Sequence, residues 1–138
     1  MPRTAELYER GVPLSIGSDS HATIDPFAEL RSLENQSRAA THRRCVVADA
    51  TGAVAPALLG DVGSTNGYAA LGFERGDDGV LLDADAPALL VGSGATLEVP
   101  TTIDDLAAAA ATAGHPGLVD RVRVLGEEVV VDGRAVAR

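Results

Sequence analysis

One loop of the chain combines side chains whose types and spacing could do chemistry. The segment Gly17-Ser18-Asp19-Ser20-His21 follows an apolar run and precedes an amphipathic stretch. A carboxylate at the C-terminal end of a parallel strand lies where α/β folds collect reacting groups, because the loops there converge on one cleft. Asp19 is therefore the candidate catalytic residue, and Ser20 and His21 are secondary candidates for contact with a substrate. The competing interpretation is that Asp19 is a turn or cap residue and that His21 bonds only locally.

The elements on either side of this loop must position it. The apolar run Val12-Pro13-Leu14-Ser15-Ile16-Gly17 predicts a short strand buried on both faces, as in a parallel sheet. Before it, Thr4 to Arg10 predict the end of a helix that Gly11 closes in a left-handed conformation. After it, Asp25 is an N-cap followed by proline at the first helical position, so a helix from about Pro26 to Arg43 is expected.

Later in the chain the apolar period changes from helical to strand-like. Residues 51–73 predict two short helices that pack through alanine and glycine faces, with Ser64 as a possible cap of the second. The charged turn 74–79 is the predicted boundary between a first part, 1–75, and a second part, 76–138. The elements expected in the second part are strands at 80–82, 88–91, 96–99, 119–125, 129–131 and 134–137 and a helix at 103–113.

Turn and cap residues fix the ends of these elements. Thr101 or Thr102 is the expected cap of the helix at 103–113, with acidic residues following in its first turn. Asp132-Gly133 lies between β-branched runs and predicts a hairpin, because both central positions of a type I′ turn need positive φ. A second turn is expected at Gly126-Glu127.

The composition limits the classes of partner. The 20 acidic residues outnumber the 11 basic ones, the formal net charge is -9, and the isoelectric point is near 4.6. Nucleic acid and anionic membrane are therefore excluded as electrostatic partners. The aromatic share of 3% means that the core must be built mainly from Ala, Val and Leu.

The single cysteine, Cys45, excludes an intrachain disulfide and a thiolate zinc site, which indicates a reducing compartment. We expect Cys45 to be a small buried apolar residue. The chain has no run of about 18 apolar residues, and its first residues lack the basic and apolar regions of a signal peptide. A cytoplasmic protein is therefore expected.

Two segments around the candidate loop are similar to a known superfamily. Residues Val12 to His21 and Asp25 to Glu34 resemble the eighth strand, its loop and the following helix of the amidohydrolase superfamily. The Gly-Ser-Asp-Ser-His loop, the Pro-x-x-Glu-Leu-Arg-x-Leu-Glu helix and the later His42-Arg43-Arg44 look most like the formimidoylglutamate deiminases. More loosely, Val122 to Ala135 resembles the small β-sandwich that closes these chains.

This resemblance implies a fold, a small-molecule substrate, a reaction and a cofactor. The fold is α/β, with 1–75 as the last strand and helix of a (β/α)8 barrel and 76–138 as part of a small β-sandwich domain with an inserted helix. The reaction is the zinc-dependent hydrolysis of N-formimino-L-glutamate to N-formyl-L-glutamate and ammonia. Asp19 would ligate the zinc and move a proton from the attacking water to the departing ammonia, with Ser20 and His21 near the substrate or the metal ligands. A homodimer is implied for the full-length enzyme.

The ligand set that the resemblance requires is incomplete in this chain. Superfamily members supply a His-x-His pair and further histidines, whereas this chain has only His21, His42 and His115. A catalytic zinc needs about three protein ligands, and a (β/α)8 barrel needs about 250 residues. We therefore expect a C-terminal fragment that is inactive and holds no zinc on its own. The alternatives are another amidohydrolase-type deaminase, or a non-catalytic remnant or binding domain.

Charged residues outside the loop have simpler interpretations. The run His42-Arg43-Arg44 lies at the end of the expected helix, where the dipole favours cations, and this interpretation is preferred to an anion site. Glu34 is expected on the helix face within reach of Arg38, at i, i+4 spacing. His115 precedes a proline and is expected at the surface.

Overall fold

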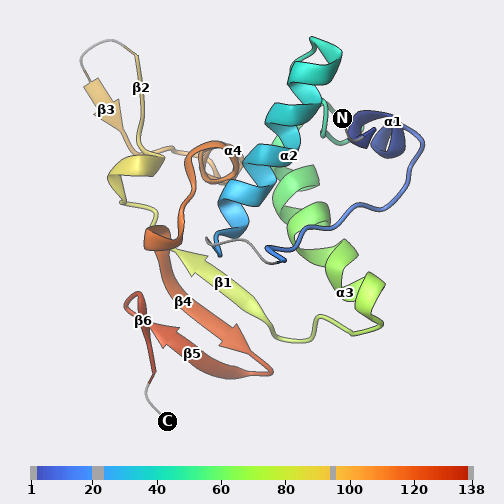
Figure 1. Ribbon diagram of the computed structural model, residues 1–138. Helices are drawn as coiled ribbons and strands as arrows, with labels where there is room; N and C mark the ends of the chain where they lie inside the picture. Colours follow the sequence, from blue (N-terminus) through green and yellow to red (C-terminus); the bar gives the residue numbers. More distant parts are fainter. Residues whose placement is uncertain (1–2, 20–23, 94–95, 137–138) are drawn as a thin grey trace.

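Helices gather on one side of the molecule and an antiparallel sheet lies on the other (Figure 1). The structure, a computed structural model, describes residues 3–19, 24–93 and 96–136. The mixed helix-and-sheet class predicted from the sequence is confirmed. Every strand pair in these residues is antiparallel, so the parallel neighbours that a barrel strand would need are absent from this part of the chain.

Helix α1 spans Thr4–Glu9, and Gly11 follows it with a φ of 73°, as predicted. The prediction of a strand at 12–17 is wrong. No strand among the described residues pairs with this segment, so its backbone forms no ladder. Leu14, Ile16 and Ser18 are half-buried and alternate with exposed neighbours, so the segment packs on one side instead of two.

Helix α2 spans Pro26–Thr41, and its beginning is defined by a side-chain cap. The Asp25 carboxylate accepts hydrogen bonds from the backbone N–H groups of Phe27 and Ala28, at 2.9 and 3.1 Å. These bonds satisfy two of the amides that the first turn leaves without helical partners. The helix ends where His42 adopts a left-handed conformation with a φ of 56°. The predicted helix is confirmed and ends two residues earlier than expected.

The chain then forms a wide π-helical segment, η1 (Pro56–Thr65), which continues directly into α3 (Asn66–Leu71). The expected break at Ser64 is absent, because Thr65 keeps helical dihedral angles of -55° and -45° and no side chain caps α3. Gly72 ends α3 in a left-handed conformation. The helical content predicted for 51–73 is therefore present, but as one run.

Four strands form the main sheet in the order β1-β4-β5-β6. Their bounds are Gly79–Leu82 (β1), Val119–Val124 (β4), Glu127–Val131 (β5) and Arg134–Ala135 (β6). Val80 lies opposite Val122, Val122 opposite Val130, and Val130 opposite Ala135. Directly opposed residues share a face, so this row forms an apolar stripe across the sheet.

Two tight turns connect the last three strands. Asp132 and Gly133 have φ values of 50° and 68°, which confirms the predicted turn between β5 and β6. The preceding turn is at Leu125 and Gly126, with φ values of 52° and 82°, because Val124 pairs with Glu127. It lies one residue earlier than predicted, since an apolar residue at positive φ has no sequence signature.

Helix α4 (Ile103–Ala113) interrupts the strands, as predicted, and the Thr102 hydroxyl caps it by accepting from the Asp105 N–H at 3.1 Å. The strand expected at 88–91 is wrong in part, because the 3-10 helix η2 (Pro87–Leu89) takes up its first residues. The remaining elements are β2 (Val91–Ser93), β3 (Thr96–Glu98) and the 3-10 helix η3 (Pro116–Leu118).

Two small clusters of buried side chains hold these elements together. The first, in the helical part, contains Leu30, Val47, Ala57, Leu58 and Val62. The second, between η2, α4 and η3, contains Ala86, Leu89, Ala110 and Leu118. Leu59 packs against both clusters, and an Arg31 guanidinium donates to the Gly114 carbonyl between α2 and the end of α4. The boundary between 1–75 and 76–138 stays a prediction.

Candidate functional site

Asp19 lies at the end of the segment that leads from α1 toward α2. Its side chain is exposed, and its backbone has a left-handed φ of 45°. Within the described part of the chain, the Asp19 carboxylate takes part in no hydrogen bond or ion pair. A left-handed conformation is uncommon for a residue with a side chain, although aspartate tolerates it better than most. The sequence candidates Ser20 and His21 lie outside the described residues.

The segment before Asp19 is held against the helical part. Leu14 and Ile16 pack against the first buried cluster. The side-chain amide of Asn66, at the start of α3, donates to the Leu14 carbonyl at 2.9 Å. On the far side of the loop, the Asp25 cap fixes the first turn of α2. Asp19 is therefore carried on a connection whose two ends are anchored to the same helical layer.

An exposed carboxylate has the donor chemistry of a zinc ligand. The described residues contain no group of three or more His, Cys, Asp or Glu side chains that could hold a metal ion. Asp19 therefore supplies one donor of the kind that the resemblance requires, and the described residues do not complete the set.

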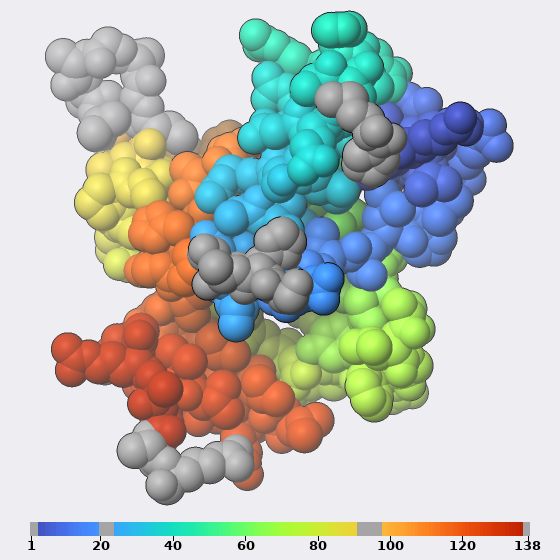
Figure 2. Space-filling model, viewed as in Figure 1, coloured from blue at the N-terminus to red at the C-terminus, as the bar shows by residue number. Residues whose placement is uncertain are grey.

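A recess lies between the start of α2 and the apolar face of the sheet. It has a volume of about 520 Å³, and Figure 2 shows it between the yellow-green residues of α3 and the orange and red strands. Phe27 and Leu30 form its wall on the α2 side, and Val80 and Val122 form its wall on the sheet side. The recess is mostly apolar and is bordered by a few polar groups, which is typical of a small-molecule site.

A hydrogen-bonded pair borders this recess. The Tyr68 hydroxyl donates to the Asp78 carboxylate at 2.6 Å, and the Leu125 N–H donates to the same carboxylate at 2.6 Å. The Tyr68 hydrogen bond is the main cause of the lowered pKa of Asp78, and the Leu125 bond adds to it. The same bond raises the pKa of Tyr68, because it stabilises the protonated phenol. The pair fastens α3 to the β4–β5 turn.

Glu34 has a role that the sequence pattern did not predict. It is buried in α2, and its two carboxylate oxygens accept from the backbone N–H groups of Val46 and Val47 at 3.0 and 2.8 Å. The expected pairing of Glu34 with Arg38 is therefore wrong, because the carboxylate instead satisfies two amides of the chain that returns after α2. An amphipathic pattern does not reveal such a contact, since it depends on where a loop returns.

Two further single-residue predictions have outcomes in the structure. Cys45 is exposed and has a left-handed φ of 53°, so the prediction that it is a buried apolar residue is wrong. His115 is exposed as predicted, and its Nδ1 atom accepts a hydrogen bond from the Gly117 N–H at 3.1 Å.

Of the helices in the described part of the chain, none combines the length and apolar character needed to cross a bilayer.

Comparison with known proteins gives no family for this chain: no protein-family model matches it, and no curated protein matches it.

Proposed function

We propose that this chain carries one metal-binding carboxylate of a zinc-dependent hydrolase that acts on C=N bonds, and that Asp19 is that carboxylate. The observation that carries the proposal is the placement of Asp19. It is an exposed carboxylate at positive φ that has no hydrogen-bond or ion-pair partner among the described residues, and it precedes the Asp25-capped helix α2 in the chain. Strained backbone conformations concentrate at functional loops, where the surroundings hold them in place.

The large accessible surface of the chain supports the proposal that it packs against further polypeptide. Its accessible surface is 9318 Å², whereas a folded monomer of this mass exposes about 6,700 Å². Several large apolar side chains contribute to the excess, among them Ile24 at 79% exposure, Leu71 at 72% and Phe73 at 67%. Such residues are expected where a further layer of protein packs.

The proposed reaction is the hydrolysis of N-formimino-L-glutamate. Water adds to the formimino carbon and the C–NH2 bond breaks, so that the products are N-formyl-L-glutamate and ammonia. A zinc ion, when bound, supplies a water of lowered pKa. The Asp19 carboxylate accepts a proton from the attacking water at an Oδ atom and returns it to the departing ammonia. Ser20 and His21 lie next to Asp19 in sequence and are proposed to contact the substrate or the other ligands.

The other ligands of the metal are proposed to lie outside this chain, because one carboxylate cannot complete a zinc site. Within the full-length enzyme, residues 1–75 would form the end of the barrel and 76–138 part of the small sandwich. Other amidohydrolase-type deaminations remain within this proposal, since Asp19 would have the same role in each. The full-length enzyme is proposed to act in the cytoplasm as a homodimer.

A non-catalytic binding domain is the second candidate. The observation that favours it is Leu59, which packs against both buried clusters and so joins them. A connected core of its own is what a self-contained domain needs. The recess of about 520 Å³ would then be the binding site.

The substitution Asp19→Asn in the natural polypeptide that contains this chain separates the two candidates. Asparagine keeps a carbonyl oxygen for the metal but cannot accept the proton, so turnover should fall by about 100-fold or more while the fold persists. Asp104→Asn, at an exposed position in the first turn of α4, is the matched control and should keep turnover. Near-normal turnover of the Asp19→Asn enzyme would remove Asp19 from the reaction.

A further inference from the structure

The residues around the end of α2 are positively charged, whereas the chain as a whole is acidic. Residues 35–48 contain no Asp or Glu, although acidic residues outnumber basic ones over the whole sequence. Within the same stretch lie Arg38, His42, Arg43 and Arg44. The protein as a whole has a formal net charge of -9, so this cluster is a local exception that the composition does not predict.

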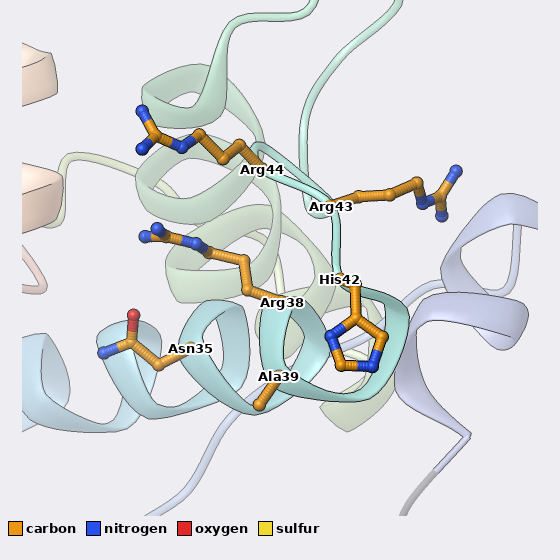
Figure 3. Close-up of a pocket in the computed structure, with 6 residues that line it drawn as sticks. All are labelled: Asn35, Arg38, Ala39, His42, Arg43 and Arg44. Carbon is orange, nitrogen blue, oxygen red and sulfur yellow. The ribbon is translucent and has the colours of Figure 1, made fainter.

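The backbone turn at the end of α2 brings this cluster to one cavity. His42 adopts its left-handed conformation there, and its backbone N–H donates to the Arg38 carbonyl at 2.8 Å. The cavity is open, with a volume of about 410 Å³. Its lining residues are Asn35, Arg38, Ala39, His42, Arg43 and Arg44 (Figure 3).

The three arginines of the cluster differ in their partners. Arg43 forms an ion pair with Glu9 of α1, and Figure 3 shows its side chain pointing away from the other two. Arg38 and Arg44 extend to the side on which the Asn35 amide lies. Neither Arg38 nor Arg44 pairs with a carboxylate of the described residues. The cavity therefore presents two uncompensated guanidinium groups and one amide donor.

The helix dipole does not account for this much charge. The C-terminus of a helix carries the equivalent of about half a negative charge. With Arg43 neutralised by Glu9, Arg38 and Arg44 still contribute two positive charges. The cavity keeps a net excess of about 1.5 positive charges after the dipole is counted.

We propose that this cavity binds a phosphate-type dianion, either free phosphate or the phosphate group of a monoester. The planar guanidinium groups of Arg38 and Arg44 each present two parallel N–H donors, which match the oxygen spacing of a phosphate. Asn35 adds a further N–H donor from the same side. Two guanidinium groups neutralise a dianion, and the volume of the cavity leaves space for an organic group on a monoester. This site is independent of Asp19 and of the proposed hydrolysis.

Calorimetric titration of the 138-residue protein with inorganic phosphate, at low ionic strength and pH 8, tests the proposal. Saturable binding is expected, and the double variant Arg38→Gln/Arg44→Gln should weaken it by roughly tenfold or more. The control Arg10→Gln/Arg134→Gln removes the same charge from exposed positions outside the cavity and should change the affinity by less than about twofold. Arg43→Gln should also have a small effect, because Arg43 is paired with Glu9. Circular dichroism verifies that each variant is folded.

A parallel titration with phenyl phosphate distinguishes the two sources of the dianion. If phenyl phosphate binds more tightly than phosphate, the ligand of the cavity is a phosphate monoester. If phenyl phosphate binds equally or more weakly, the ligand is free phosphate. The proposal is overturned if no saturable binding occurs up to about 10 mM phosphate, which corresponds to less than about 3 kcal/mol of binding free energy. It is also overturned if the cavity variant and the control variant lose affinity equally.

Discussion

The hydroxyl of Tyr68 in α3 donates a 2.6 Å hydrogen bond to the carboxylate of Asp78, which immediately precedes β1. The same carboxylate accepts from the backbone of Leu125 at the turn between β4 and β5. One ionised side chain thus joins the helical layer to two places in the sheet. This contact borders the apolar recess, so its loss should loosen the two walls of that recess together.

The Asp78 contact predicts a pH dependence of stability. The folded state lowers the pKa of Asp78 below its ordinary value of 3.8, so the contribution is complete above that value. It should be lost as the pH falls below about 3.8 toward the lowered pKa. Asp78→Asn should lower the Tm by a few degrees at pH 6, and the difference from the natural chain should shrink toward pH 3. The exposed neighbour Asp77→Asn is the control; an equal effect there would contradict the assignment.

The buried carboxylate of Glu34 should stabilise the helical part of the protein. Glu34→Gln leaves one of the two backbone amides at Val46 and Val47 without a good acceptor, so the free energy of unfolding should fall by about 1 to 3 kcal/mol. Glu29→Gln, one turn and a half earlier in α2, should cost less than about 1 kcal/mol. Urea unfolding of both variants provides the comparison. Equal stability of Glu34→Gln and the natural chain would show that the two amides are satisfied in another way.

Two glycine substitutions with opposite expected signs test the backbone assignments. Gly133→Ala should destabilise the protein by about 1 to 2 kcal/mol, because Gly133 has a φ of 68° and a Cβ there would lie 3.3 Å from the Val119 carbonyl oxygen. Gly60→Ala lies in η1 with free space around it and should stabilise by about 0.5 to 1 kcal/mol. Thermal unfolding measures both. A stabilising Gly133→Ala would contradict the turn between β5 and β6.

Helix starts and one turn were predicted from the sequence because the contacts that form them join residues close together in the chain. Asp25 with Pro26 begins α2, Thr102 begins α4, and Asp132-Gly133 makes the last turn. Each of these signals acts within three residues of its own position. The helix and turn boundaries are therefore close to those expected from the sequence.

The errors arise where long-range contacts decide the structure. The apolar run at 12–17 has the composition of a strand but packs its alternate residues against helices, because no strand lies beside it among the described residues. The position of Glu34 suggested a surface ion pair, yet the chain returning after α2 buries it. For the candidate site, the sequence indicated Asp19 by type and loop position. The arginine cavity depends instead on the directions of the Arg38, Arg43 and Arg44 side chains around the turn at His42.

The isolated 138-residue chain should self-associate. Its exposed apolar side chains include Leu71, the last residue of α3, and Phe73, two residues later, and exposed apolar surface favours association. We expect a mass above 14.1 kDa by light scattering and dye binding typical of exposed apolar surface. Amide exchange should be slowest around the Asp132-Gly133 hairpin. A monomer with a sharp cooperative melt would favour the self-contained binding domain.

Ammonia release from N-formimino-L-glutamate tests the proposed function most directly. The natural polypeptide that contains these residues, purified from its own cells, should be compared with the isolated 138-residue chain. We predict release by the natural polypeptide that stops when zinc is removed and returns when zinc is restored, and no release by the isolated chain. Absence of release from the natural polypeptide with zinc present, or zinc-independent release by either protein, would contradict the assignment of Asp19 to a zinc-dependent hydrolase.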